Sequence, residues 1–302
     1  MKISMSVALL SCLFINRPVG LFAEKNPEQL TRAIASANLA VHHRRNSRFT
    51  EAEKYFRLTY KLRNEALGPD HTDTAIALNN IADLETTLAR YDEAEQNFRR
   101  ALSARNLTMA DRIAIRNNLG NLLRMQGRFA EAQRQFHENP RDSISLNNLA
   151  RLAEDQMQFA QAMQFYQAAF DISPTPAIQA NLGRLHLRLG NLREARRLLK
   201  SALAQQPTAA ERMVMLHSMA ELLLAENRLV DAVATFQRTL ELRQQLLGTT
   251  HPGLVPLLTD FAAALKEHRQ GRKARELETR ARKLAVQIEQ SRPNVHWRTL
   301  VE

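Results

Sequence analysis

A short phrase that ends in alanine recurs along most of this 302-residue sequence. Arg-Phe-Thr-Glu-Ala ends at Ala52 and Arg-Tyr-Asp-Glu-Ala ends at Ala94, and looser copies follow at intervals of 30 to 42 residues. The length of this interval suits a unit of two helices, so the recurrence favours an array of helical repeats. The seven marker alanines are Ala52, Ala94, Ala132, Ala162, Ala195, Ala232 and Ala274.

Two further positions keep a fixed distance from each marker alanine. Four residues later, six of the seven units have Phe, Tyr or Leu, and the seventh has Glu278. Two antiparallel helices pack closely where a small residue on one meets a large residue on the other. Each unit is therefore predicted to be an antiparallel helix pair, and an irregular bundle with accidental spacing is disfavoured. Twelve residues before the markers the sequence has only the smallest residues: Ala40, Ala82, Gly120, Ala150, Gly183, Ala220 and Ala262.

Turn-forming residues agree with this division. Gly127 and Gly190 lie five residues before their marker alanines, where the first helix of each pair should end. Pro174 and Pro207 follow second helices and are expected to terminate them. Pro140 is expected to shorten the second helix of the third repeat.

The pattern of an apolar and a small residue in the first helix, followed by Gly-Arg-Phe-x-Glu-Ala-x-x-x-Phe, resembles the tetratricopeptide repeat over residues 30–286. The resemblance implies an all-α fold, a right-handed α-solenoid of about seven antiparallel helix–turn–helix repeats. It also implies that the first helices line a concave groove. Two repeats are similar to the longer kinesin-light-chain variety: Leu62-Arg63 precedes Leu67-Gly68-Pro69-Asp70-His71, and Leu242-Arg243 precedes Leu247-Gly248-Thr249-Thr250-His251-Pro252.

Asparagine recurs fourteen residues before the marker alanines in five consecutive repeats. The tetratricopeptide resemblance implies that such asparagines form a ladder along the groove and hold the backbone of an extended ligand. An amide side chain suits this role because it offers both a donor and an acceptor. We expect these side chains to be exposed in the free protein; the alternative is that they bond only to neighbouring helices or to water. The five are Asn38, Asn80, Asn118, Asn148 and Asn181.

Three residues further along the same helix face, the middle repeats have Asn121, Arg151 and Arg184, with Arg188 one turn after Arg184. Arginine binds carboxylates with two parallel hydrogen bonds. This stretch is therefore predicted to favour acidic side chains or a free C-terminus. Asp155 lies four residues after Arg151 and could instead neutralise it within the helix.

The sequence has no pattern that indicates catalysis or a cofactor. It has no phosphate-binding glycine loop and no nucleophile elbow. His42 and His43 are adjacent, so they point to different helix faces, and we identify no Glu or Cys companion at metal-ligand spacing. His71 and His251 occupy equivalent connectors, which indicates a structural role. We therefore predict no catalytic residue, no metal and no cofactor.

The charge balance bears on the partner. Forty-two Lys and Arg against 31 Asp and Glu give a net charge of +11, which favours acidic partners. Aromatic residues that could stack on bases are scarce, and the basic residues are mixed with acidic ones. The sequence thus predicts a non-catalytic scaffold that binds a protein or an extended peptide. The alternative is an electrostatic binder of nucleic acid or another polyanion, and an enzyme is disfavoured because the repeats occupy nearly the whole length.

The first residues have the character of an export signal. Met1-Lys2 precedes an apolar run from Ile3 to Ile15, which is too short to cross a membrane but suits the core of a signal peptide. We expect residues 1–23 to be a signal peptide or an N-terminal anchor, residues 24–286 the repeat array and residues 287–302 a tail. The expected location is periplasmic or secreted, and the alternative is cytoplasmic. Contact with a membrane is expected only through an uncleaved N-terminal segment.

Overall fold

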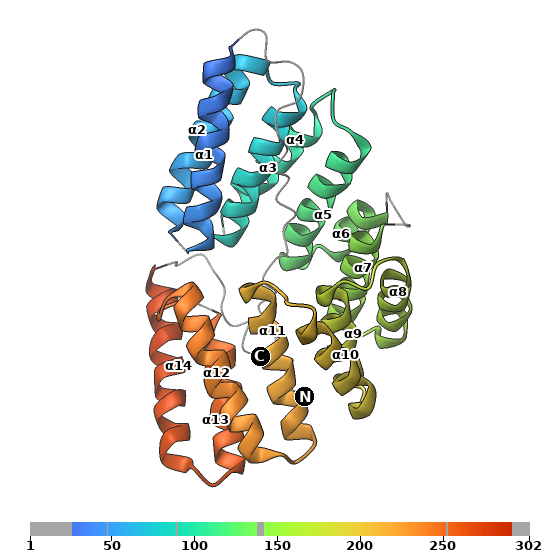
Figure 1. The fold of residues 1–302 in the computed structure, drawn as a ribbon, viewed down its shortest axis with the longest axis vertical. Coiled ribbons are helices and arrows are strands. Elements are labelled where there is room, and N and C mark those ends of the chain that lie inside the picture. The colour runs from blue at the N-terminus through green and yellow to red at the C-terminus, as the bar shows by residue number, and fades with distance from the viewer. Residues whose placement is uncertain (1–25, 47, 89, 138–141, 252, 292–302) are drawn as a thin grey trace. The chain divides into compact units, whose positions relative to one another are not determined.

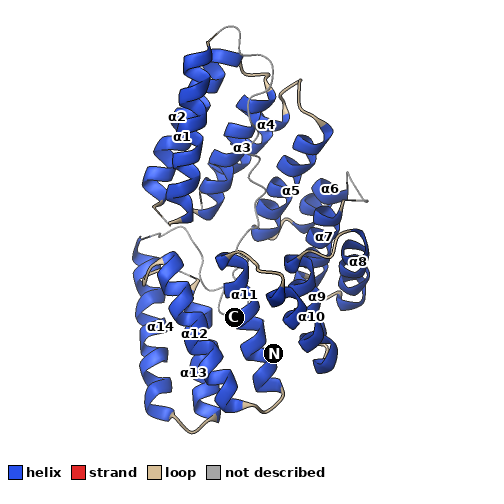
Figure 2. Ribbon diagram, in the orientation of Figure 1, coloured by secondary structure: helices blue, strands red, loops and turns tan. Residues whose placement is uncertain are grey.

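The computed structural model describes residues 26–46, 48–88, 90–137, 142–251 and 253–291. Within these ranges the chain forms fourteen α-helices and no β-strand (Figure 2), which confirms the all-α prediction. None of these helices combines the length and the apolar character needed to cross a lipid bilayer. The expected signal segment, residues 1–23, and the tail after residue 291 lie outside the described residues.

The helices form two compact units, divided between residues 172 and 173 (Figure 1). The N-terminal unit contains α1 (Pro27–Arg45), α2 (Phe49–Leu67), α3 (Thr72–Thr87), α4 (Tyr91–Leu102), α5 (Met109–Met125), α6 (Phe129–His137), α7 (Ser143–Asp155) and α8 (Phe159–Ile172). The C-terminal unit contains α9 (Pro176–Arg188), α10 (Leu192–Ala204), α11 (Ala209–Ala225), α12 (Leu229–Leu247), α13 (Leu254–Glu267) and α14 (Gly271–Ser291).

Each odd-numbered helix pairs with the next helix, and the seven pairs coincide with the seven sequence repeats. Within the N-terminal unit successive pairs stack through α2 on α3, α4 on α5 and α6 on α7; within the C-terminal unit they stack through α10 on α11 and α12 on α13. First helices also contact one another, α3 with α5, α5 with α7 and α9 with α11. The predicted stack of helix pairs is therefore confirmed within each unit.

The contact between small and large residues is the one that the fixed offsets predicted. All seven marker alanines are completely buried. Gly120 lies against the ring of Phe136, so close that a Cβ at position 120 would stand 2.4 Å from Cε1 of the ring. Gly183 lies against Leu199, where the corresponding distance to Cγ is 3.1 Å. The first helix of each of these repeats can approach the second only because its side chain is absent at this position.

The turn between the two helices has one backbone conformation in the five repeats where the structure describes it, the third to the seventh. Five residues before the marker alanine, at the predicted end of the first helix, Gly127 and Gly190 have φ of 73° and 79°. Met157, Asn227 and Arg269 take the same left-handed conformation at the equivalent place, with φ of 60°, 58° and 57°. The turn therefore requires a positive φ even where the sequence has no glycine, at a cost of about 1–2 kcal/mol for a residue with a Cβ.

The two long repeats share a connector that explains their histidines. His71 Nδ1 accepts the backbone N–H of Asp73 at 3.1 Å, and His251 Nδ1 accepts that of Gly253 at 3.0 Å. A buried guanidinium binds the carbonyl of the same residue in each case, from Arg63 at 3.1 Å and from the equivalent Arg243 at 2.7 Å. The structural role predicted for the two histidines is confirmed.

Two local departures from the repeat pattern have visible causes. The second helix of the third repeat, α6, ends at His137 and is only nine residues long, as the nearby Pro140 predicted. Glu278, the polar exception among the large residues, forms an ion pair with Lys266 at 2.5 Å. Helix α14 continues to Ser291, beyond the expected end of the array at residue 286.

We predict that Gly120→Ala lowers the free energy of unfolding and that Gly183→Ala hardly changes it. At position 120 the new methyl group overlaps the buried Phe136 ring, and overpacking of this kind costs about 1–3 kcal/mol. At both positions the loss of glycine from a helix returns about 0.5–1 kcal/mol. Urea unfolding of the two variants measures the difference, and equal stability of both would contradict the packing argument.

Candidate functional site

The predicted ligand-binding residues all lie on first helices, but most are less accessible than expected. Asn38 on α1 and Arg188 on α9 are exposed, while Asn181, Arg151 and Arg184 are half-buried. The expectation that the ladder asparagines are exposed in the free protein is wrong for the central repeats. The buried members of the set, each at most 9% exposed, are Asn80, Asn118, Asn121 and Asn148.

Two of these buried amides form hydrogen bonds between successive first helices. Asn118 Nδ2 on α5 donates to Oδ1 of Asn79 on α3 at 3.0 Å. Asn148 Nδ2 on α7 donates to Oδ1 of Asn117 on α5 at 3.3 Å. In both cases the acceptor is the asparagine that precedes the ladder position in the previous repeat. The acceptor asparagine and the ladder asparagine are adjacent, so the sequence shows the doublet Asn-Asn in three repeats. This doublet is a signal for contacts between repeats that a single ladder position does not contain.

The same hydrogen-bond network fixes the start of α7 against α5. Asp142 caps α7 by accepting the backbone N–H of Ser145 at 2.7 Å and its hydroxyl at 2.8 Å. The Ser145 hydroxyl also lies 3.2 Å from Oδ1 of Asn117. The ladder in this region therefore holds two repeats together, which corresponds to the interhelical alternative.

Asn121 differs from its neighbours on α5. Its side chain is 6% exposed, and its Oδ1 has no hydrogen-bond partner among the described residues. A buried acceptor that lacks a donor costs about 1–3 kcal/mol, and most such groups in folded proteins have a partner. Asn121 thus has a buried acceptor that the described residues leave unsatisfied.

Ion pairs also join successive first helices of the N-terminal unit. Arg44 on α1 pairs with Asp83 on α3, and Arg124 on α5 pairs with Asp155 on α7. Asp155, which the sequence offers as a partner for Arg151 within α7, forms an ion pair with the preceding repeat. Opposite charges on this face therefore serve contacts between repeats.

In the C-terminal unit the predicted arginines lie near a carboxylate of the protein itself. Burial raises the pKa of Glu221 on α11, and the charges of His217, Arg184 and Arg188 act in the opposite direction. The two arginines, proposed from the sequence to attract an acidic ligand, therefore already stabilise the Glu221 carboxylate.

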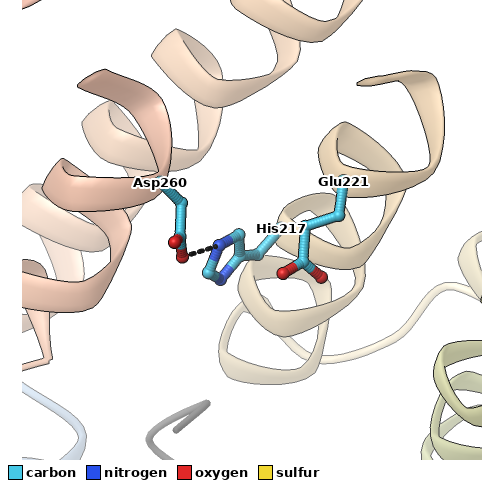
Figure 3. Close-up of side chains that lie close together, drawn as sticks. All are labelled: His217, Glu221 and Asp260. Atoms are coloured by element: carbon cyan, nitrogen blue, oxygen red, sulfur yellow. Dashed lines mark hydrogen bonds and ion pairs between the residues drawn. The ribbon is translucent and has the colours of Figure 1, made fainter. Parts of the chain in front are cut away.

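The structure brings together three side chains, His217, Glu221 and Asp260, that the sequence pattern does not indicate (Figure 3). His217 Nε2 on α11 is 3.1 Å from Oδ2 of Asp260 on α13, and Glu221 is four residues after His217 on the same helix. One potential ligand atom from each of the three side chains lies within 4.8 Å of the others. The spacing of His217 and Glu221 was visible in the sequence, but the position of Asp260 requires knowledge of how α13 packs on α11.

Comparison with protein-family models matches three segments of the chain. Residues 31–106 and 112–139 match tetratricopeptide repeat models. Residues 155–252 match a model of the fourth ARM domain of tetratricopeptide repeat protein 21. Tetratricopeptide repeat protein 21B of Mus musculus is 25% identical over 141 residues, which cover 44% of this chain and 11% of that protein. The chain thus spans about a tenth of this curated relative.

Solved structures with the same fold have low sequence identity. The Rap conjugation gene regulator of plasmid pLS20, in complex with the Phr* peptide, has a TM-score of 0.69 at 12% identity. The match covers 91% of this chain and 79% of the regulator. The APC/C hetero-tetramer Cut9–Hcn1 has a TM-score of 0.64 at 15% identity, covering 88% of this chain and 48% of that one. A thermophilic tetratricopeptide repeat protein of Thermus thermophilus has a TM-score of 0.51 at 19% identity. The match covers 63% of this chain and 99% of that chain.

We predict that Asn118→Ala destabilises the protein, because it removes the donor to Asn79 and leaves a buried acceptor without a partner. The free energy of unfolding should fall by about 1–3 kcal/mol. Asn38→Ala is the matched control, because this ladder residue is exposed and its loss should change stability by at most about 0.5 kcal/mol. Urea unfolding of both variants is the measurement, and an Asn118 variant as stable as the control would show that the hydrogen bond contributes little.

Proposed function

Because the chain is a tetratricopeptide repeat protein, we propose that it is a non-catalytic scaffold that binds another protein or an extended peptide. The bound segment lies along the first helices. Two proteins of similar fold are consistent with this kind of partner, since the Rap regulator is seen with a peptide and Cut9 with Hcn1.

The observation that carries the proposal is the buried Oδ1 of Asn121, which has no hydrogen-bond partner among the described residues. Asn121 lies on α5, one helical turn after Asn118, and therefore on the face that carries the ladder. In the proposal, rotation of the Asn121 side chain brings this acceptor to the surface, where a backbone N–H of an extended ligand supplies the missing donor. A hydrogen bond between this amide and the ligand backbone does not depend on the ligand's side chains, so it suits a scaffold that binds extended peptides of different sequence.

The hydrogen bonds divide the ladder into two kinds of residue. Asn118 and Asn148 hold the repeats in register through their bonds to the preceding helix. In the proposal, Asn121 makes the contact with ligand in the N-terminal unit. Asn38 on α1, which is more accessible than the central asparagines, extends the binding surface within the N-terminal unit. Asn181 on α9 gives the C-terminal unit an amide of its own.

An acidic ligand is favoured by the cations of the same first helices. Arg151 on α7 is half-buried and, in the proposal, adds a bidentate donor to the same surface.

The polyanion alternative has its own supporting observation. Helix α14 exposes cationic side chains along much of its length, and these could bind a phosphate backbone without recognising sequence. Duplex DNA binding that persists at physiological salt would favour this alternative over the peptide scaffold. The exposed cations of α14 are Arg272, Lys273, Arg275, Arg282 and Lys283.

We predict that Asn121→Ala weakens binding of the partner without destabilising the fold. The partner is first isolated by affinity capture on the full chain and identified by mass spectrometry, and its binding segment is then titrated as a peptide. One lost hydrogen bond of about 1 kcal/mol corresponds to roughly a fivefold weaker Kd. Removal of the unpaired acceptor returns the cost of its burial, while truncation of the buried side chain loses packing; because the two effects oppose each other, the free energy of unfolding should change little.

The matched control is Asn118→Ala, which lies one turn earlier on α5 and should lose stability. If Asn121→Ala binds the peptide as tightly as the wild-type protein, the ligand does not contact this amide and the proposed binding face is wrong.

We further predict that Arg151→Ala weakens binding of an acidic peptide more than binding of the same peptide with Glu and Asp replaced by Gln and Asn. The difference should shrink as salt is raised, because exposed charges are screened beyond about 10 Å at 0.1 M ionic strength. Isothermal titration at low and high salt measures both effects. An equal loss for the two peptides would contradict the acidic preference while leaving backbone recognition intact.

A further inference from the structure

The cluster of His217, Glu221 and Asp260 contains one imidazole and two carboxylates, and one potential ligand atom of each lies within 4.8 Å of the others. Residues 217 and 221 are one helical turn apart on α11, so both side chains lie on the same side of that helix. Asp260 approaches from α13 and contacts the imidazole (Figure 3). The three potential ligands thus come from two helices of adjacent repeats within the C-terminal unit.

The distance between the first two ligand atoms already suits a metal ion. His217 Nε2 and Asp260 Oδ2 are 3.1 Å apart. In a tetrahedral site with ligand bonds of about 2.0–2.1 Å, neighbouring ligand atoms are about 3.3–3.4 Å apart. An ion can therefore take the place of the proton between these atoms once the imidazole and the carboxylate rotate so that a lone pair of each faces it. Glu221 has three rotatable side-chain bonds and can close the remaining gap from 4.8 Å.

The charges around the cluster indicate which class of ion fits. Two carboxylates contribute negative charge, while Arg184 and Arg188 act on Glu221 and Arg243 acts on Asp260. The surrounding cations cancel the general attraction for a positive ion, so affinity must come from direct bonds to the ligand atoms. Calcium and magnesium depend on six or more oxygen ligands, whereas zinc and its neighbours bind strongly to imidazole with few ligands.

We propose that His217, Glu221 and Asp260 bind a divalent transition-metal ion of the zinc class, with the fourth coordination position open to water. The ion joins α11 to α13 and so connects the sixth repeat to the seventh. The site is independent of the proposed peptide-binding surface on α5 and α7.

The test is metal titration of the full chain after removal of any affinity tag. Zinc should bind with a stoichiometry of one and raise the Tm, since a ligand that binds only the folded state stabilises it. Cobalt should give visible absorption bands of a four-coordinate ion, and calcium and magnesium should give no Tm shift. Removal of a residue that only supports a metal ligand already weakens metal binding by about tenfold or more. His217→Ala removes a ligand itself, so it should weaken zinc binding by at least that factor.

Two conservative variants keep the test independent of folding. Glu221→Gln and Asp260→Asn preserve side-chain shape, and each should also weaken zinc binding at least about tenfold while circular dichroism shows the fold intact. His268→Ala, at the end of α13, and the double change His42→Ala with His43→Ala are controls for adventitious histidine binding and should bind zinc as the wild type does. Absence of zinc binding at millimolar concentration would overturn the proposal, as would equal binding by wild type and Glu221→Gln.

Discussion

The close approach of the two helices within each repeat is the constraint on which the rest of the fold depends. It exists because a residue without a large side chain stands opposite a large one, as Gly120 does opposite Phe136. The completely buried marker alanines perform the same function from the second helix. A helix pair held at this distance presents a regular surface to the next pair, so the same contact that forms a repeat also determines how repeats stack.

Stacking places equivalent polar residues of successive first helices near one another, and the chain uses them to join repeats. An amide pair joins α3 to α5 and another joins α5 to α7, while ion pairs join α1 to α3 and α5 to α7. Apart from the exposed Asp155, these groups are largely withdrawn from water, and a hydrogen bond to a partner is worth more there than at the surface. They also make the register between repeats specific, because an amide displaced by one helical turn would lose its partner.

The sequence predicted the features that depend on offsets within a repeat, and it failed for features that depend on the register between repeats. Helix pairing, the left-handed turn at Gly127 and the connector histidines all follow from residues close together in the chain. The burial of Asn118 does not, because its acceptor Asn79 belongs to a different repeat. Asp260 could not be assigned to His217 for the same reason. Unequal repeat lengths of 30 to 42 residues prevent a simple offset from predicting which side chains meet across repeats.

The first-helix face therefore has two physical demands that oppose each other. Polar groups that bond to the next repeat stabilise the stack but are no longer available to a ligand, whereas groups kept for a ligand remain unsatisfied in the free protein. Asn118 and Asn121 represent these two solutions one turn apart on the same helix: the first has an acceptor in the protein, and the Oδ1 of the second has no donor among the described residues. A protein can retain a buried unsatisfied acceptor if the rest of the structure stabilises it, and such local costs concentrate at functional positions. The hydrogen bond of Asn118 stabilises the stack and so offsets the cost of the unsatisfied acceptor of Asn121; under the proposed function, the structural ladder and the binding surface therefore depend on each other.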